Sequence, residues 1–213
     1  MTKEQKEELK LINKAVQNTI KQVIKKKSCK IASNCIYEKI KDYFVHAVFF
    51  IRFTNNQYLL TIRMNIKLYY YDDIFWKVID MKDNIHQKDS LRANGAYVAP
   101  SIQWKEKSYI ITDANCIEQI CNDVVDDFKY ESRSFIETII LRYNNFDSFA
   151  LHQSGIMDEK LIKMLANINI KKYADAEALA QSELNQGHGG RFQNKGIDIN
   201  EYILMYCGMM KNV

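Results

Sequence analysis

The most regular pattern in the chain is an alternation of apolar and polar positions between Tyr58 and Tyr71. The apolar residues fall on every even position, namely Tyr58, Leu60, Ile62, Met64, Ile66, Leu68 and Tyr70. This period of two is typical of a β-strand with one buried face and one face in contact with water. The preceding segment, Phe44–Phe53, is apolar at nearly every position and predicts a strand covered on both faces. Because a short polar stretch, 54–57, joins the two, we expect a β-hairpin.

Helical periodicity dominates most of the remaining sequence. The segment Thr2–Lys27 repeats apolar residues at steps of three and four, which predicts an amphipathic helix with Thr2 as its N-cap and Gln5 as the capping-box partner. Similar apolar stripes predict further helices at 74–81, 114–129, 135–143, 158–168 and 173–184, and one that follows Asp198 or Asn200. The pattern leaves open whether 114–129 and 135–143 are two helices or one.

Weaker β-patterns at Ile31–Lys41, Ala96–Trp104 and Tyr109–Thr112 predict additional strands, with a turn at 105–108. Strands that precede a run of helices favour an α+β fold over alternating strands and helices. We therefore expect an antiparallel sheet of about four to six strands packed by helices, followed by a helical C-terminal section.

The length of 213 residues predicts one domain, with or without a smaller appendage. We assign residues 1–144 to an α+β core and residues 145–213 to the helical section, which either completes the core or forms a subdomain. Hydrophobic residues make up 47% of the chain, which argues against a disordered or fibrous protein. A single proline and seven glycines provide no flexible linker that would mark a boundary.

The net charge of +4 is lower than we expect for a dedicated nucleic-acid binder. The main basic cluster lies at the end of the first helix and consists of Lys21, Lys25, Lys26, Lys27 and Lys30. Cations at a helix C-terminus interact favourably with the helix dipole, so this cluster has a structural explanation. Nucleic acid is therefore a disfavoured partner. Frequent lysine, isoleucine and asparagine indicate AT-rich codons and hence a bacterial source of low GC content.

Five cysteines lack the paired spacing of a zinc site, and no metal or cofactor is predicted. The N-terminus is too polar for a signal peptide, and no apolar run approaches the length needed to span a membrane. The sequence thus predicts a cytoplasmic protein with reduced thiols and no membrane association.

No catalytic residue is assigned from the sequence, and whether the protein is an enzyme is left open. The glycine-rich segment 187–196 lacks the Lys-Ser/Thr of a phosphate loop, and we interpret it as a link between helices in preference to an anion site formed by His188 and Arg191. His46 lies in the most apolar strand, where a hydrogen-bonded core histidine is favoured over a general base.

The polar side of the long alternating strand is the predicted binding surface. Arg63 and Lys67 lie four residues apart on it, beside Tyr69 and Tyr71, and we expect Arg92 and Trp104 at its rim (Arg63, Lys67, Tyr69, Tyr71, Arg92 and Trp104). Cations among aromatic side chains suit a macromolecular partner. The alternative is that these charges only solvate a half-buried strand.

These observations favour a non-catalytic module that binds another macromolecule, most plausibly a protein. A toxin-neutralising partner is a narrower form of this hypothesis, based only on the general plan of the fold. The alternatives are an enzyme or small-molecule-binding protein whose site is assembled from distant residues, and a nucleic-acid-binding protein.

Overall fold

The computed structural model describes residues 1–211. The chain forms two compact units, each built from two stretches of sequence. Unit 1 comprises residues 1–66 and 103–137, and unit 2 comprises residues 67–102 together with the chain from residue 138 onward. The division into domains at residue 144 stays a prediction.

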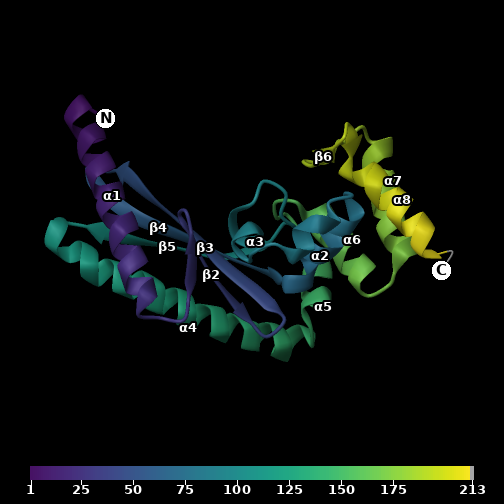
Figure 1. The fold of residues 1–213 in the computed structure, drawn as a ribbon, viewed down its shortest axis with the longest axis horizontal. Helices are drawn as coiled ribbons and strands as arrows, with labels where there is room; N and C mark the ends of the chain where they lie inside the picture. Colours follow the sequence, from purple (N-terminus) through teal and green to yellow (C-terminus); the bar gives the residue numbers. More distant parts are fainter. Residues whose placement is uncertain (212–213) are drawn as a thin grey trace. The chain divides into compact units, whose positions relative to one another are not determined.

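Unit 1 is built on a five-stranded antiparallel sheet in which the strands are neighbours in the order of the sequence (Figure 1). The strands are β1 (Lys30–Ala32), β2 (Cys35–Ile40), β3 (Tyr43–Thr54), β4 (Gln57–Leu68) and β5 (Ile102–Ile111). The predicted α+β class with an antiparallel sheet is confirmed. The predicted hairpin is β3–β4, whose two connecting residues, Asn55 and Asn56, have φ angles of 50° and 56°. Asparagine tolerates this left-handed conformation, which two-residue hairpin turns require.

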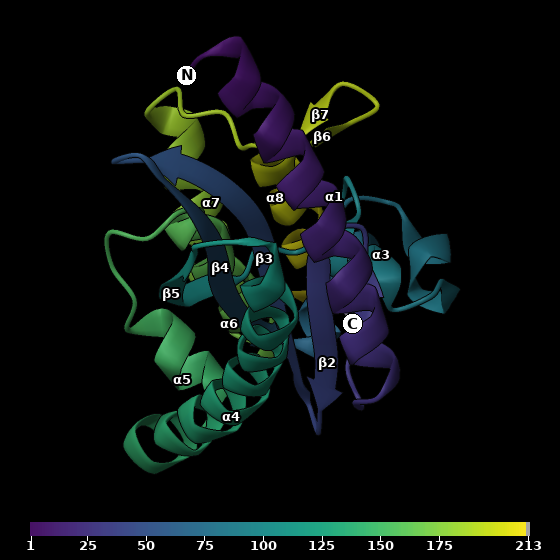
Figure 2. The same cartoon turned by 90° about the vertical axis from the view of Figure 1, so that its left-hand side faces the viewer.

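Unit 1 is completed by one long helix and by residues 117–137 of a second (Figure 2). Helix α1 (Lys3–Lys25) begins with the predicted capping box, because the Gln5 N–H donates to Thr2 Oγ1 and the Thr2 N–H donates to Gln5 Oε1. Helix α4 (Ile117–Tyr143) is continuous through the polar stretch 130–134, so the two predicted segments are one helix. The even-numbered residues of β4 face α1, since the Tyr58 hydroxyl donates to Glu8 at 2.7 Å. The opposite face of β4 carries its odd-numbered residues.

Several predicted strand boundaries are wrong. The alternating strand ends at Leu68, and Tyr69 begins helix α2 (Tyr69–Val78). As a helix, this segment buries Tyr71, Phe75 and Trp76 together and places Asp72 in its first turn, where an acidic residue favours the helix dipole. The predicted strand 31–41 is divided into β1 and β2 by a turn in which Ser33 has a φ of 56°. The predicted turn at 105–108 lies inside β5.

Unit 2 is mainly helical. Its helices are α2, α3 (Ser90–Asn94), α5 (Phe146–Leu151), α6 (Glu159–Asn169), α7 (Tyr173–Asn185) and α8 (Ile199–Lys211), with a 3₁₀ turn at Lys82–His86 and a two-stranded hairpin, β6 (Gln193–Asn194) and β7 (Ile197–Asp198). Helix α7 packs between α6 and α8 (Figure 1). The helical C-terminal section predicted from the sequence is confirmed. Within residues 1–211, no helix combines the length and apolar character that crossing a membrane requires.

Candidate functional site

The structure divides the six residues of the predicted binding surface between the two units. Arg63 and Trp104 belong to unit 1, whereas Lys67, Tyr69, Tyr71 and Arg92 belong to unit 2. The environments of the two groups differ strongly.

Arg63 belongs to an exposed ionic cluster on the face of the sheet opposite α1. Its Nε donates to Glu106 Oε2 at 2.6 Å, and Arg52 Nη2 donates to Glu106 Oε1 at 3.1 Å. The side chains of Arg52, Arg63 and Glu106 are 42%, 48% and 32% exposed. The hydrogen bond from Arg63 is the main cause that lowers the pKa of Glu106. One carboxylate therefore neutralises only one of two solvent-accessible guanidinium groups.

An aromatic ring lies beneath this cluster. The guanidinium carbons of Arg52 and Arg63 are 5.5 and 4.9 Å from the centroid of the Phe50 ring, which is within the range of a cation–π interaction. Arg52 Nε also donates to Thr61 Oγ1 at 3.2 Å, and the Thr61 and Ser108 hydroxyls are 2.9 Å apart. We call these residues from β3, β4 and β5 the arginine surface (Phe50, Arg52, Thr61, Arg63, Glu106 and Ser108).

Sequence reasoning identified only Arg63 within the arginine surface. A signal for a second member was present, because Arg52 and His46 are the two exceptions to the apolar pattern of Phe44–Phe53, and Arg52 faces the same side of the sheet as Arg63. Glu106 was hidden by the incorrect turn predicted at 105–108. Trp104 lies on the same strand as Glu106, and its ring stacks on Phe135 of α4 with 4.5 Å between centroids and 9° between planes.

Lys67 is buried in unit 2, with 1% of its side chain exposed. Its Nζ lies 2.8 Å from Asp72 Oδ1, 3.1 Å from the Arg92 carbonyl oxygen and 3.2 Å from the Ala99 carbonyl oxygen. All three ammonium protons thus have acceptors inside the protein. This arrangement ties the end of β4 to the start of α2 and to the segment that follows α3.

Arg92 is equally buried and is held between two aromatic rings. Its guanidinium carbon lies 3.9 Å from the centroid of the Tyr69 ring and 4.8 Å from that of Trp76. Its Nη2 donates to Asp73 Oδ1 at 2.7 Å. Burial raises the pKa of Asp72, and the Lys67 ammonium opposes this shift. We call Lys67, Asp72 and Arg92 the buried ionic cluster.

The expectation that all six predicted residues lie on one open face is therefore wrong for three of them. Lys67 and Arg92 are 1% exposed and Tyr71 is 0% exposed, and the Tyr71 hydroxyl donates to Asp147 at 2.9 Å. The Lys67 ammonium and the Tyr71 hydroxyl are hydrogen-bonded within the fold, whereas Arg92 pairs with Asp73 but its buried Nε has no hydrogen-bond partner. Tyr69 is half-buried, and its hydroxyl donates to Asp89 at 2.8 Å.

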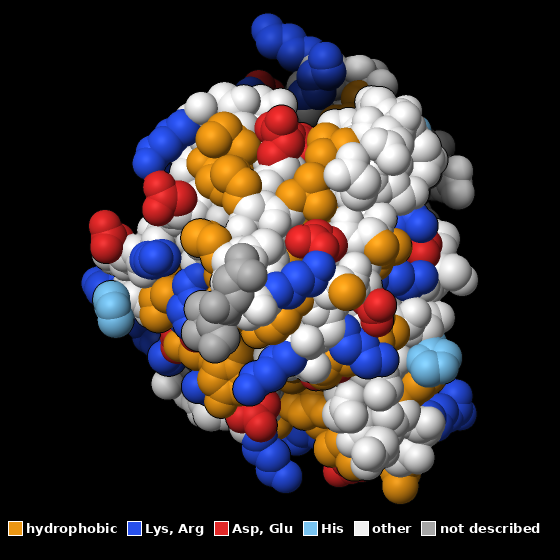
Figure 3. Space-filling view, turned by 90° about the vertical axis from the view of Figure 1, so that its right-hand side faces the viewer, with side chains coloured by type: hydrophobic (Ala, Val, Ile, Leu, Met, Phe, Trp, Pro, Cys, Tyr) orange, Lys and Arg blue, Asp and Glu red, His pale blue; other side chains and the backbone are white. Residues whose placement is uncertain are grey.

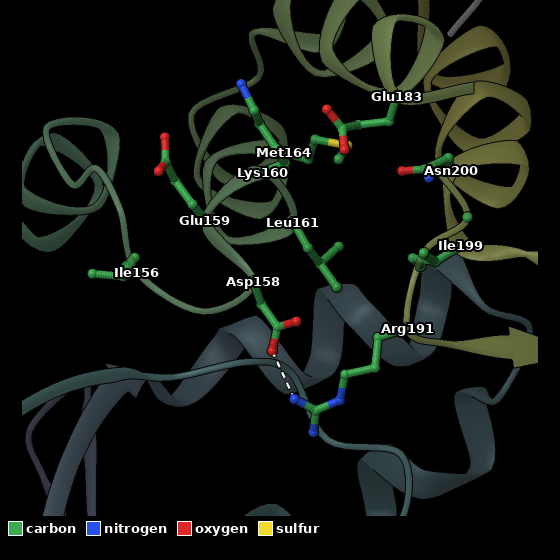
Figure 4. Close-up of a pocket in the computed structure, with 12 residues that line it drawn as sticks. Ile156, Asp158, Glu159, Lys160, Leu161, Met164, Glu183, Arg191, Ile199 and Asn200 are labelled. Atoms are coloured by element: carbon green, nitrogen blue, oxygen red, sulfur yellow. Dashed lines mark hydrogen bonds and ion pairs between the residues drawn. The ribbon is translucent and has the colours of Figure 1, made fainter. Parts of the chain in front are cut away.

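Unit 2 contains a polar hollow of about 470 Å³ beside the glycine-rich segment (Figure 4). Arg191 lies at its rim and donates to Asp158 at 2.9 Å, whereas Glu183 and Asn200 come from the opposite side. The segment packs closely here, because a Cβ at Gly190 would lie 2.0 Å from Ile199 Cγ2. The lining carries both acidic and basic side chains, so the positive charge that would attract an anion is offset by acidic groups.

The structure also places a cysteine next to His46. Cys35 Sγ is 3.6 Å from His46 Nδ1, and the two residues are 0% and 9% exposed. In this conformation the thiol has no surface at which it could meet a substrate. Among residues 1–211, no three or more His, Cys, Asp or Glu side chains are grouped so that they could hold a metal ion.

Comparison of the chain with protein-family models, with curated proteins and with solved structures finds no match.

Proposed function

We propose that the protein is a non-catalytic module that binds another protein, and that the arginine surface of unit 1 is its contact region. The observation that supports this proposal most directly is the pair of half-exposed guanidinium groups over Phe50, with a single carboxylate between them. Arginine and aromatic side chains are enriched in protein interfaces. A bound acidic group would find one guanidinium charge that Glu106 does not neutralise.

The small-molecule alternative has a specific location, which is the polar hollow of unit 2. The nucleic-acid alternative has less support, because nucleic-acid binders concentrate positive charge on one face. On the face seen in Figure 3, lysine and arginine side chains are interspersed with acidic ones, and the hydrophobic side chains form separate patches. Lys27 of the basic cluster forms an ion pair with Asp126.

The proposal can be tested with two variants that remove the same charge from different units. Arg52→Gln with Arg63→Gln removes two cations from the arginine surface. Lys195→Gln with Lys211→Gln removes two exposed cations from unit 2, where they pair with Asp80 and Glu177. The tagged proteins are used to capture binding proteins from a cell lysate, which are quantified by mass spectrometry.

We expect the arginine variant to lose its specific partner at least about tenfold, since removal of desolvated interface charges typically costs more than 1.4 kcal/mol. The unit 2 variant should retain that partner. Equal recovery by the wild type and the arginine variant would contradict the proposed contact region. Circular dichroism of both variants checks that the fold is unchanged.

A further inference from the structure

Strand β3 extends beyond the strand that pairs with it. Strand β2 pairs with β3 only from Tyr43 to Val48, and the contact ends where the Phe49 N–H donates to the Asn34 carbonyl at 2.9 Å. The Asn34 side-chain amide in turn donates to the Phe49 carbonyl at 3.2 Å. The chain turns away at this point, because Ser33 and Asn34 connect β2 to the three-residue strand β1, which pairs only with β2.

Residues 50–54 of β3 therefore have a strand partner, β4, on one edge alone. The N–H and C=O groups of alternate residues in a strand point to the same edge. Since those of Phe49 point toward β2, the groups of Ile51 and Phe53 point toward the edge that β2 leaves uncovered. Within residues 1–211, no other strand of the sheet lies next to this edge. An exposed edge of this kind is a template for pairing with another chain.

A hollow of about 310 Å³ lies alongside the free edge. Its lining combines the N-terminal half of α1, the turn between β1 and β2, and β3 itself (Leu9, Lys10, Asn13, Gln17, Ser33, Asn34, Phe49, Phe50 and Ile51). There is thus space for the side chains of a bound segment beside the backbone groups of Ile51 and Phe53 that β2 does not pair.

We propose that this edge binds an extended segment of a partner protein, which adds to the sheet as an antiparallel strand in line with β2. The inference rests on the proposed function and specifies how the partner is held. Recognition by strand addition takes its affinity from main-chain hydrogen bonds and its specificity from alternate side chains. The five residues 50–54 offer about 17 Å of strand, at roughly 3.3 Å per residue.

The two faces of the sheet determine the sequence of this segment. A residue opposite Ile51 points to the side of α1, where Leu9, Phe49 and Ile51 are the apolar part of a lining that also carries polar side chains. We expect this residue to be apolar because it pairs with Ile51 across the strands. Its neighbours point to the other face, which carries Arg52. The Arg52 guanidinium contacts Glu106 and Ser108 of β5, and in the proposed complex it turns toward the free edge to meet these neighbours. There the two guanidinium groups exceed the single carboxylate of Glu106 by one charge, so these neighbours are acidic. The expected segment alternates apolar and acidic residues.

The test uses fluorescein-labelled ten-residue peptides in which aspartate and valine alternate. In an antiparallel pair, the residue opposite Ile51 directs its own N–H toward β3, and the next residue directs its N–H away. N-methylation of the valines therefore removes the hydrogen bonds that their N–H groups donate to β3, whereas N-methylation of the aspartates leaves those hydrogen bonds intact. Binding to the wild-type protein is measured by fluorescence anisotropy, with a lysine–valine peptide as the charge control.

We expect the valine-methylated and lysine–valine peptides to bind at least about tenfold more weakly than the aspartate–valine and aspartate-methylated peptides. Equal binding of the two methylated peptides, or no binding of the aspartate–valine peptide up to millimolar concentration, would overturn the proposal. Ile51→Pro, which lacks the N–H, should likewise bind more weakly than Ile51→Val. Sedimentation that shows a dimer lost in Ile51→Pro but retained in Ile51→Val would assign the edge to a second copy of this chain instead.

The two proposals can fail separately. If the arginine variant loses its lysate partner but both methylated peptides bind alike, the contact region stands and strand addition is wrong. If the arginine variant keeps all partners, the proposed contact region fails whatever the peptides do.

Discussion

The arginine surface and the buried ionic cluster contain similar groups in opposite environments. Arg63 and Lys67 lie four residues apart on the same strand, and their side chains are 48% and 1% exposed. The Glu106 pKa is lowered by its partner's hydrogen bond, whereas the Asp72 pKa is raised by burial in spite of its partner. In the arginine surface, the guanidinium groups are open to water and therefore accessible to the charges of a partner. In the buried ionic cluster, the charged groups form their contacts within the protein.

This difference has an energetic consequence. An exposed ion pair contributes about 0–1 kcal/mol to stability, because water already solvates both charges. Removing one member of a buried pair costs about 3–5 kcal/mol, because the remaining charge is left without compensation. The comparison can therefore be tested by removing one cation from each cluster.

The largest effect is expected from Lys67→Met. This change leaves the Asp72 carboxylate and the carbonyl groups of Arg92 and Ala99 without their shared donor, so the free energy of unfolding should fall by about 3–5 kcal/mol. Urea denaturation followed by tryptophan fluorescence measures this value. A Trp104→Phe background leaves Trp76, in unit 2, as the only tryptophan, so the signal reports the unit that contains Lys67.

Arg63→Met is the matched control for Lys67→Met. It also removes a cation and keeps an unbranched apolar side chain, but its site is open to water, so a loss of no more than about 1 kcal/mol is expected. Circular dichroism follows this variant. Similar losses in the two variants would show that burial does not distinguish the clusters energetically.

A smaller effect is expected in the pH dependence of the Lys67 variant. An acid with a raised folded-state pKa contributes stability that is present below its unfolded pKa and lost as pH rises through the folded pKa. Because Lys67 opposes the rise for Asp72, Lys67→Met raises this pKa further. The melting temperature of Lys67→Met should therefore fall more steeply, as pH rises above the unfolded-state Asp pKa of about 4, than that of Lys67→Met with Asp72→Asn. Parallel curves would mean that Asp72 is not the responsible group.

The sequence was sufficient for those features that depend on local patterns. The β3–β4 hairpin and the α1 capping box follow from alternation, turn residues and a three-residue spacing. Alternation also showed correctly that Arg63 and Lys67 share one side of β4. It could not show that one end of that side is buried, because the acceptors of Lys67 come from residues 92 and 99 and from a helix whose first three residues were predicted as strand.

Most of the arginine surface was also missed, because its contacts likewise join residues that are far apart in the sequence. Its members come from three strands, and Arg52 and Glu106 are 54 residues apart. Pairing between such distant residues depends on strand order and register, which the pattern of a single segment does not contain. The free edge of β3 likewise depends on where β2 begins, and the sequence predicted β1 and β2 as one uninterrupted strand.

The smallest effect concerns the titration of Glu106. Its lowered pKa means that its ion pairs contribute stability above the unfolded pKa, and that this contribution is lost as pH falls through the folded pKa. The loss should be slight, because the side chain is 32% exposed and water screens the pairs. Carbon-13 NMR of the carboxyl group should show a higher pKa in Arg63→Gln than in Arg52→Gln, since the hydrogen bond from Arg63 is the main cause of the shift.

The order of the Glu106 pKa values in Arg63→Gln and Arg52→Gln also bears on binding. If Arg52→Gln raises the Glu106 pKa as much as Arg63→Gln does, both guanidinium groups are equally engaged with Glu106, and neither is more available to a partner. If the expected order holds, Arg52 is the cation less engaged with Glu106, although it also donates to Thr61 and Ser108, and its backbone lies on β3 next to the free edge at Ile51 and Phe53. An acidic residue of an added strand would pair with Arg52 once its guanidinium turns from Glu106 and Ser108 of β5 toward the free edge. Glu106 would then keep its hydrogen bond from Arg63, and the Glu106 pKa should stay low when the aspartate–valine peptide binds.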